Sequence, residues 1–343
     1  MRAAVGRDGQ AFAIERVPLP DPGPGEVRVR VTACGLCGSD LHLQRMGFFA
    51  SGRTPGHEIA GVVDRAGSAV AGLAAGQTVA VEPLLSCGDC PECRSGRDPL
   101  CRKSRLLGVH ASGGFAEYVV APAGRLFPAP AELAPAIAAL AEPLAVSIHG
   151  LRRGALESGQ RVLVLGAGSV GLLTLLAAKA LGAGEVWISA RYPHQAERAR
   201  ALGADRVLGE NEADARSLAA LGAEAPLDLV VETVGGSADT LADGAAAVRP
   251  GGRVVVLGLF PAPLRLNTMP LMLKEVSLVW SYCYHQAQGE HRADFADAVA
   301  LLSREPGQAA LLTSHQVALD EIERAFTIAS HKESGVIKVS VTP

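Results

Sequence analysis

The stretch Arg161-Val162-Leu163-Val164-Leu165-Gly166-Ala167-Gly168-Ser169-Val170-Gly171 decides the fold. Its apolar run predicts a buried strand, and the glycine triplet that follows opens an amphipathic helix that extends to Leu181. Three glycines at this spacing allow a tight turn, a close backbone approach to a pyrophosphate, and close packing of the helix on the strand. Free N–H groups at the helix start would bind the phosphates. The context therefore predicts a dinucleotide site formed by Gly166, Gly168, Ser169, Val170 and Gly171.

Strands and helices alternate around this loop, which predicts repeated βαβ units and a parallel sheet. Six candidate strands suit a doubly wound dinucleotide fold with two mononucleotide-binding halves; they lie at 162–165, 186–189, 206–208, 229–232, 254–257 and 277–280. The preceding part of the chain contains short β-like runs between turns rich in Pro, Gly and Cys, at 27–31, 61–64, 78–81 and 116–120. The tail predicts helices at 295–303 and 320–330 and strands at 314–319 and 336–341, and we expect it to rejoin the first domain.

The size and composition of the chain narrow its function class. A length of 343 residues favours two domains. A net charge of -3 gives no basic surface for nucleic acid or an anionic membrane, so we expect a small-molecule partner. The longest apolar stretch, 172–183, is interrupted by Lys179 and is too short to span a bilayer. No charged-then-apolar leader opens the sequence, and its seven cysteines suggest reduced thiols, so we expect a cytoplasmic protein.

The end of the second parallel strand bears on the choice of dinucleotide. A carboxylate there normally accepts a hydrogen bond from the ribose 2′-hydroxyl, but this sequence places Arg191 after Ser189 and Ala190. A cation favours NADP(H) by pairing with the 2′-phosphate. The alternative is a solvated surface arginine in an enzyme that accepts either NADP(H) or NAD(H). We expect the nicotinamide near the ends of later strands, at Val234 and Leu257.

A cluster of cysteines predicts a closed metal site. The ligands would be Cys87, Cys90, Cys93 and Cys101, in a polar stretch with little apolar surface to bury. Four thiolates can enclose one tetrahedral zinc, and such a loop would depend on the metal for its order. A ferredoxin-like iron–sulfur site would need a shorter interval before the fourth cysteine and usually a proline after it. We therefore interpret the cluster as a structural zinc site.

Candidate catalytic groups lie elsewhere in the chain. Cys37 and His57 offer a soft thiolate and an imidazole, and Glu142 is an acid in an otherwise apolar stretch. A catalytic zinc needs about three protein ligands and one position for water or substrate. These three residues can supply that set, although a histidine or a cysteine taken alone is more often an ordinary packed residue.

These motifs give the chain a resemblance to the zinc-dependent medium-chain dehydrogenases/reductases, nearest the polyol and threonine dehydrogenase branch. The resemblance covers nearly the whole length: Cys37-Gly38-Ser39-Asp40, Gly56-His57-Glu58, the four-cysteine segment, Ala139 to Leu144 and the glycine loop occur in the family's order. It implies a GroES-like β-rich catalytic domain at 1–146, a Rossmann-type domain at 147–285, and a C-terminal segment, 286–343, that returns to the catalytic domain. It also implies a homodimer or homotetramer built by pairing strand 277–280 of two copies.

The resemblance also implies roles for the site residues. Cys37, His57 and Glu142 would be the ligands of a catalytic zinc, one of two zinc ions per chain, with Glu58 an adjacent acid. Asp40 is expected to accept a hydrogen bond from the second nitrogen of His57. Zinc would act as a Lewis acid on the oxygen of a secondary alcohol or polyol while its carbon releases a hydride to NAD(P).

A short proton relay completes this hypothesis. Ser39 would take the proton from the alcohol oxygen, and His42 would pass it towards solvent unless it is only a surface histidine. Two alternatives compete with the dehydrogenase: a zinc-free quinone or enoyl reductase of the same superfamily, and a zinc-ribbon binding module. The sequence leaves open which alcohol is the substrate and whether Glu58 ever ligates the zinc.

Overall fold

The computed structural model describes residues 1–7, 11–285 and 293–343 and divides the chain into two compact units. The first unit comprises Met1–Glu142 and His285–Pro343, and the second comprises Pro143–Tyr284. The change from one unit to the other falls inside α4 (Ala141–Arg153). Residues 286–292, at the start of the predicted C-terminal segment, lie outside the described residues, and so does His291, which the sequence left without a functional role.

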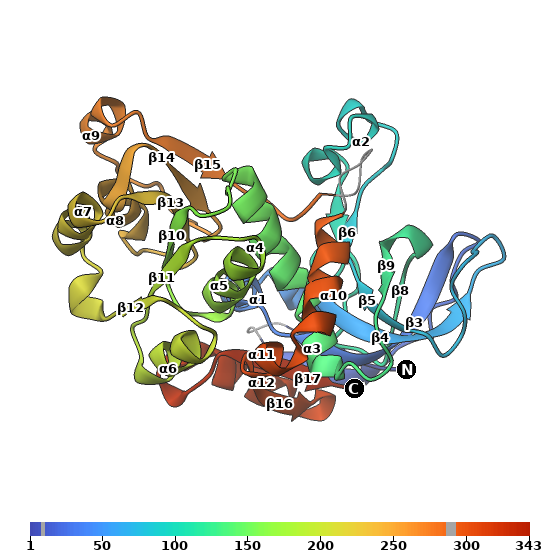
Figure 1. The fold of residues 1–343 in the computed structure, drawn as a ribbon. Helices are drawn as coiled ribbons and strands as arrows, with labels where there is room; N and C mark the ends of the chain where they lie inside the picture. The colour runs from blue at the N-terminus through green and yellow to red at the C-terminus, as the bar shows by residue number, and fades with distance from the viewer. Residues whose placement is uncertain (8–10, 286–292) are drawn as a thin grey trace. The chain divides into compact units, whose positions relative to one another are not determined.

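The first unit is built mainly of antiparallel β-structure (Figure 1). In its described residues a seven-stranded sheet has the order β16-β17-β3-β4-β5-β9, with β8 paired to β3. The strands of the unit are β1 (Arg2–Gly6), β2 (Phe12–Arg16), β3 (Glu26–Gly35), β4 (Glu58–Ala66), β5 (Thr78–Val81), β6 (Leu84–Leu85), β7 (Arg105–Leu106), β8 (Tyr118–Pro122), β9 (Leu126–Pro128), β16 (Thr313–Ala318) and β17 (Lys338–Thr342), of which β1 pairs with β2 and β6 with β7 in two small separate sheets. The C-terminal strands β16 and β17 therefore complete the sheet that the N-terminal strands begin.

Short helices connect the strands of this unit. They are α1 (Gly38–Arg45), α2 (Pro91–Arg94), α3 (Pro135–Ala138), α10 (Asp294–Arg304), α11 (Pro306–Ala310) and α12 (Ile322–Ser330), with 3-10 turns η2 (Phe48–Ser51), η3 (Asp98–Leu100), η4 (Ala123–Arg125), η6 (Leu319–Glu321) and η7 (Lys332–Ser334). α12 carries Phe326 into the core, where its ring centroid lies 4.7 Å from that of Phe12. A ring pair at this separation adds to the stabilisation by apolar burial. The contact ties the C-terminal helix to the N-terminal strands.

The second unit is a doubly wound α/β sheet. In the part of it that the structure describes, six parallel strands have the order β12-β11-β10-β13-β14-β15, the 3-2-1-4-5-6 order of a dinucleotide-binding fold. They are β10 (Arg161–Leu165), β11 (Glu185–Ser189), β12 (Arg206–Leu208), β13 (Leu227–Glu232), β14 (Val248–Val256) and β15 (Ser277–Trp280). All six predicted strands are confirmed. Near-continuous runs of Val, Leu and Ile form them because both faces of the sheet are covered.

Helices cover the two faces of this sheet. The helices of the unit are α4, α5 (Ser169–Ala180), α6 (Pro193–Ala201), α7 (Ala215–Glu224), α8 (Thr240–Ala247) and α9 (Thr268–Leu273), with the 3-10 turn η5 (Glu210–Glu212). Figure 1 shows α4 and α5 on one face and α7 and α8 on the other. None of the helices in the described part of the chain has the length and apolar character that a membrane crossing requires.

Candidate active site and metal centres

Cys37 and His57 come together at the ends of neighbouring elements of the β-rich unit. Cys37 precedes the first turn of α1, and His57 precedes β4. Gly56 allows this approach because its φ is +95° and a Cβ at this position would lie 2.7 Å from the Sγ of Cys34. Ligand atoms of Cys37, His57 and Glu58 all lie within 4.8 Å of one another. The structure thus collects a thiol, an imidazole and a carboxylate around one point.

Asp40 supports both members of this pair from the first turn of α1. One of its carboxylate oxygens, Oδ2, accepts a hydrogen bond of 3.0 Å from the backbone N–H of Cys37. Its other oxygen, Oδ1, lies 3.4 Å from Nδ1 of His57, and neither of these two buried atoms has a hydrogen-bond partner within the described residues. Because Nδ1 faces Asp40, Nε2 is left as the ligand atom of the imidazole.

The charges in this cluster favour a cation. Burial alone would lower the pKa of His57, but Asp40 and Cys37 outweigh it and raise that pKa well above the usual value. A thiolate, an imidazole and nearby carboxylates are also the donor types that zinc prefers in proteins. The residues present therefore fit a zinc ion with His57 as a neutral ligand.

Two acids and a lysine lie beside the same cluster. Lys338, from β17, donates to both carboxylate oxygens of Glu58, at 2.6 Å and 2.8 Å, and all three of these polar atoms are buried. Burial alone would lower the pKa of Lys338, but the negative charges of Glu58, Cys37 and Glu142 outweigh it and raise the pKa. Glu142 is itself buried in the first turn of α4. The structure therefore groups Glu58, rather than Glu142, with Cys37 and His57, and places both acids within electrostatic reach of one ammonium.

The two predicted relay residues lie on α1. Ser39 and His42 are both half-buried and three residues apart, so they occupy neighbouring positions on one helix face. Both follow Cys37, which is the N-cap residue of that helix.

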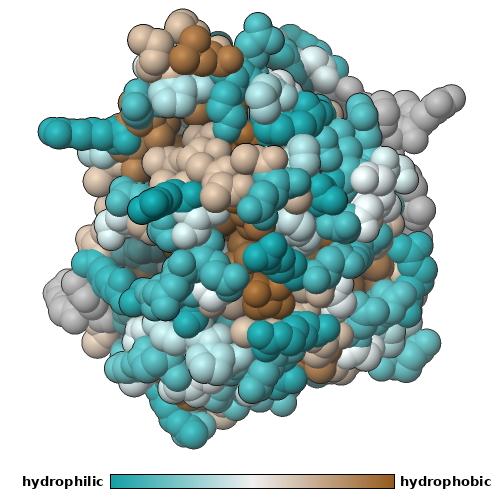
Figure 2. Space-filling view, turned by 60° about the vertical axis from the view of Figure 1, so that its left-hand side comes forward, coloured by the Kyte–Doolittle hydropathy of each residue, from teal (hydrophilic) through white to brown (hydrophobic). Residues whose placement is uncertain are grey.

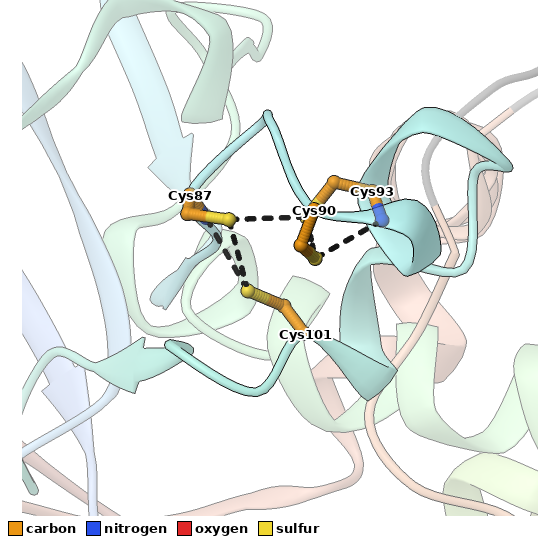
Figure 3. A group of neighbouring side chains, drawn as sticks. All are labelled: Cys87, Cys90, Cys93 and Cys101. Carbon is orange, nitrogen blue, oxygen red and sulfur yellow. Dashed lines mark hydrogen bonds between the residues drawn. The ribbon is translucent and has the colours of Figure 1, made fainter.

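The four predicted cysteines form a compact group around α2. Measured sulfur–sulfur distances are 3.4 Å for Cys90–Cys93, 3.5 Å for Cys87–Cys101 and 3.9 Å for Cys87–Cys93. Thiolates bound tetrahedrally to zinc at about 2.3 Å stand about 3.8 Å apart. Figure 3 shows sulfurs of Cys87, Cys90 and Cys101 turned toward a common centre. Burial and the neighbouring Cys90 raise the pKa of Cys93 to about 12, so this thiol ionises only with a cation beside it.

A buried ion network anchors the four-cysteine lobe, residues 87–101, to the sheet. Arg125 donates to Ser86 Oγ at 2.6 Å, to Asp98 Oδ2 at 3.1 Å and to Glu82. Asp98 belongs to the lobe, Ser86 precedes it, and Glu82 follows β5. Sequence reasoning missed this network because the partners are 27 to 43 residues apart.

The glycine loop makes a tight turn between β10 and α5. Gly166 has a φ of +97°, and a Cβ at this position would lie 2.5 Å from Cγ2 of Val234. A Cβ at Gly171 would lie 1.8 Å from the carbonyl oxygen of Gly166, whereas one at Gly168 would have no atom within 4 Å. Gly168 thus borders open space at the N-terminus of α5, where N–H groups can bind phosphate.

A buried acid shapes the neighbouring turn and escaped the sequence analysis. Glu232, at the end of β13, accepts from the backbone N–H groups of Val234 and Gly235 at 2.8 Å and 2.9 Å. Its carbonyl oxygen accepts a hydrogen bond of 2.9 Å from Leu257 N–H, directly after β14. The two predicted nicotinamide positions, Val234 and Leu257, are therefore linked through Glu232. The sequence did carry a signal of this role, because Glu232 is a single acid at the end of an apolar strand.

Arg191 lies between β11 and α6, on the surface. Its Nε is 3.4 Å from Oε1 of Glu210, and more than two thirds of each side chain is exposed. Its guanidinium lies over the ring of Tyr192, and that ring stacks on His194 with centroids 5.7 Å apart. An exposed, weakly paired cation at this edge remains available to another anion.

Comparison with known proteins identifies the family. The family described as "Alcohol dehydrogenase GroES-like domain" matches residues 23–131, and the one described as "Zinc-binding dehydrogenase" matches residues 169–304. An L-threonine 3-dehydrogenase of Pyrococcus horikoshii is 36% identical over 78% of both chains. A sorbitol dehydrogenase of Bacillus subtilis is 31% identical over 100% of this chain and 97% of its own.

A solved structure agrees with these relatives. A protein of Sinorhizobium meliloti, described as a zinc-binding dehydrogenase and bound to NADP, superposes with a TM-score of 0.89. It is 32% identical, and the match covers 100% of this chain and 99% of the other. The chain belongs to the zinc-binding medium-chain dehydrogenases and is an NAD(P)-dependent alcohol or polyol dehydrogenase. The zinc-ribbon alternative is discarded, since the match includes the dinucleotide-binding unit.

Proposed function

We propose that this enzyme oxidises a secondary alcohol at a zinc ion held by Cys37, His57 and Glu142, with a second zinc held by the four cysteines. The observation that carries the proposal is the buried cluster in which Cys37 and His57 meet beside Asp40, with Glu58 and Glu142 near. A zinc ion there would supply Lewis acidity toward the alcohol oxygen. Asp40 fixes the tautomer and orientation of His57, so that Nε2 keeps its lone pair for the metal.

The residues of α1 handle the proton in this proposal. Ser39 accepts it from the alcohol, and His42 carries it to solvent, one turn further along the same helix. Replacing Ser39 by alanine should lower turnover strongly and leave zinc content unchanged. Wild-type turnover in that variant would remove Ser39 from the relay. A His42→Gln variant tests the second step, and its turnover should be restored in part by added imidazole buffer.

We propose NADP(H) as the preferred dinucleotide. Support comes from Arg191, which stands where NAD-selective folds place a carboxylate and is exposed on the surface. Its present partner, Glu210, would yield to a 2′-phosphate, which carries more charge and permits bidentate hydrogen bonds. Arg191→Asp should raise the KM for NADP(H) and lower that for NAD(H). The matched control is Arg200→Asp, an arginine in the last turn of α6 and further along the chain from β11. An unchanged ratio of the two Michaelis constants in Arg191→Asp would refute the assignment.

For the substrate we propose a polyol, sugar alcohol or amino alcohol. Glu142, a carboxylate among the proposed zinc ligands, and the polar relay of α1 favour a polar substrate, and the relatives named above act, by their names, on threonine and sorbitol. A panel of these three classes and of simple secondary alcohols, each with NADP and with NAD, tests the proposal. Faster turnover of simple apolar alcohols would contradict it.

We propose a homodimer or homotetramer formed through β15. This strand ends the six-stranded sheet, and Trp280 on it is 57% exposed. Apolar side chains also gather over the adjoining α9, where Met272 and Leu273 are exposed; Figure 2 shows this apolar area at the top of the molecule. An unpaired edge strand beside exposed apolar surface is a template for pairing with a second copy. A monomeric mass in sedimentation would contradict the proposal, and Trp280→Glu should shift a dimer toward that mass.

We also propose a reducing, cytoplasmic location. All seven cysteines are free thiols, and four of them must stay reduced to hold a metal.

A further inference from the structure

Lys338 forms a buried ion pair with Glu58 that the sequence did not predict. Its ammonium contacts both oxygens of the Glu58 carboxylate, at 2.6 Å and 2.8 Å, and donates to the carbonyl oxygen of Leu36 at 3.3 Å. The two charged side chains are 3% and 0% exposed. Water therefore cannot replace either partner, and each charge depends on the other.

Three adjacent strands build the space for this pair. Glu58 opens β4, Gly35 is opposite it on β3, and Ser340 of β17 faces Gly35 from the other side. A Cβ at Gly35 would lie 1.9 Å from Oε2 of Glu58, so only glycine leaves room for the carboxylate. The Glu58 carboxylate thus occupies a fixed position inside the sheet, beside the last residue of β3, the strand that leads to Cys37.

The same carboxylate is also close to the proposed metal ligands. One of its oxygens lies within 4.8 Å of both the Cys37 Sγ and a ring nitrogen of His57. A carboxylate at this distance could become a ligand after a small side-chain movement. Two cations, the ammonium of Lys338 and a metal ion, would therefore compete for Glu58.

We propose that Lys338 is a positioning residue that holds Glu58 back from the metal and so keeps one coordination position free for the alcohol. The proposal rests on the proposed function, since it requires a metal at Cys37 and His57. When a neutral residue replaces Lys338, the buried carboxylate loses the ammonium that both of its oxygens contact and can turn toward the metal. Glu58 then becomes an additional ligand, blocks the open position and holds the metal more tightly.

The test compares Lys338→Met with the wild type by the rate at which zinc passes to a chromogenic chelator. Release of zinc from this site is the kinetic phase that disappears in the Cys37→Ala variant. We expect that phase to slow by about tenfold or more in Lys338→Met, since groups next to metal ligands typically change metal affinity 10- to 100-fold. The KM for the alcohol should rise. In cobalt-substituted protein the visible absorption should weaken, as it does when a four-coordinate ion gains a ligand.

Two matched variants separate this effect from a general loss of structure. Lys338→Arg keeps the cation and should release zinc at the wild-type rate. The double variant Lys338→Met/Glu58→Gln removes the competing carboxylate and should also return to that rate. Should Lys338→Met not fold, Lys338→Gln keeps a neutral donor for Glu58 and should show the same slowing to a smaller degree.

The outcomes distinguish this inference from the proposed function. A wild type that binds one zinc and lacks the Cys37-dependent phase refutes the proposed function. A wild type that binds two zinc ions, with equal release rates and equal cobalt spectra in the wild type and both uncharged variants, refutes only the role of Lys338. Slowing that persists in the double variant also refutes it, because Glu58 would then not be the group that moves.

Discussion

Replacing Arg125 by methionine should destabilise the β-rich unit and loosen the four-cysteine lobe. Arg125 donates to Glu82, Ser86 and Asp98, and the two acids are only 1% and 5% exposed. Methionine fills a similar volume but removes the guanidinium that contacts both buried carboxylates. Removing one partner of a buried ion pair typically costs about 3–5 kcal/mol. We expect a loss of that size in the free energy of unfolding.

Denaturant titration followed by circular dichroism measures this loss, and chelator-driven release of the lobe's zinc measures the loosening. The control is Arg102→Met, which removes an arginine directly after the lobe that is 87% exposed and should change stability by less than about 0.5 kcal/mol. In Arg125→Met/Glu82→Met the Glu82 charge that Arg125 offset is gone as well, so part of the stability should return. An Arg125→Met protein as stable as the Arg102→Met protein would refute the reasoning.

Two further predictions concern the dinucleotide-binding unit. Gly171→Ala drives a Cβ into the Gly166 carbonyl and should lower stability by about 1–3 kcal/mol along with dinucleotide affinity, whereas Gly168→Ala should lose affinity alone; equal melting temperatures of the two variants would contradict this. Burial would raise the pKa of Asp228, but hydrogen bonds from Arg161 and Arg249 outweigh it and hold the pKa below its usual value. Its stabilisation is therefore present above about pH 4 and is lost as pH falls through the folded-state pKa. Asp228→Asn should be about 1.5–3 kcal/mol less stable than the wild type at pH 7, and urea titration should show this difference shrinking as pH falls below about 4; a constant difference across pH would contradict the assignment.

Local patterns of the sequence predicted the sheet and the glycine loop well. The strand at 162–165 and the glycines after it depend on neighbours within one βαβ unit, so their structure follows from short-range periodicity and turn chemistry. The four cysteines were predictable for the same reason, because their spacing of a few residues limits where their sulfurs can lie.

Long-range pairs escaped the prediction. Lys338 meets Glu58 across 280 residues, and only the folded sheet brings β17 beside β3 and β4. A lysine inside an otherwise apolar strand was a signal of a buried partner, but the identity of that partner was not in the local sequence. The grouping of Glu58, rather than Glu142, with Cys37 and His57 likewise depends on side-chain geometry that spacing does not encode.

Metal content per chain, measured by elemental analysis of purified wild-type protein and of Cys37→Ala, tests the central claim most directly. We predict two zinc ions in the wild type and one in a folded Cys37→Ala protein that has lost dinucleotide-dependent alcohol oxidation. One zinc in the wild type, retained unchanged in Cys37→Ala, would contradict the catalytic zinc site.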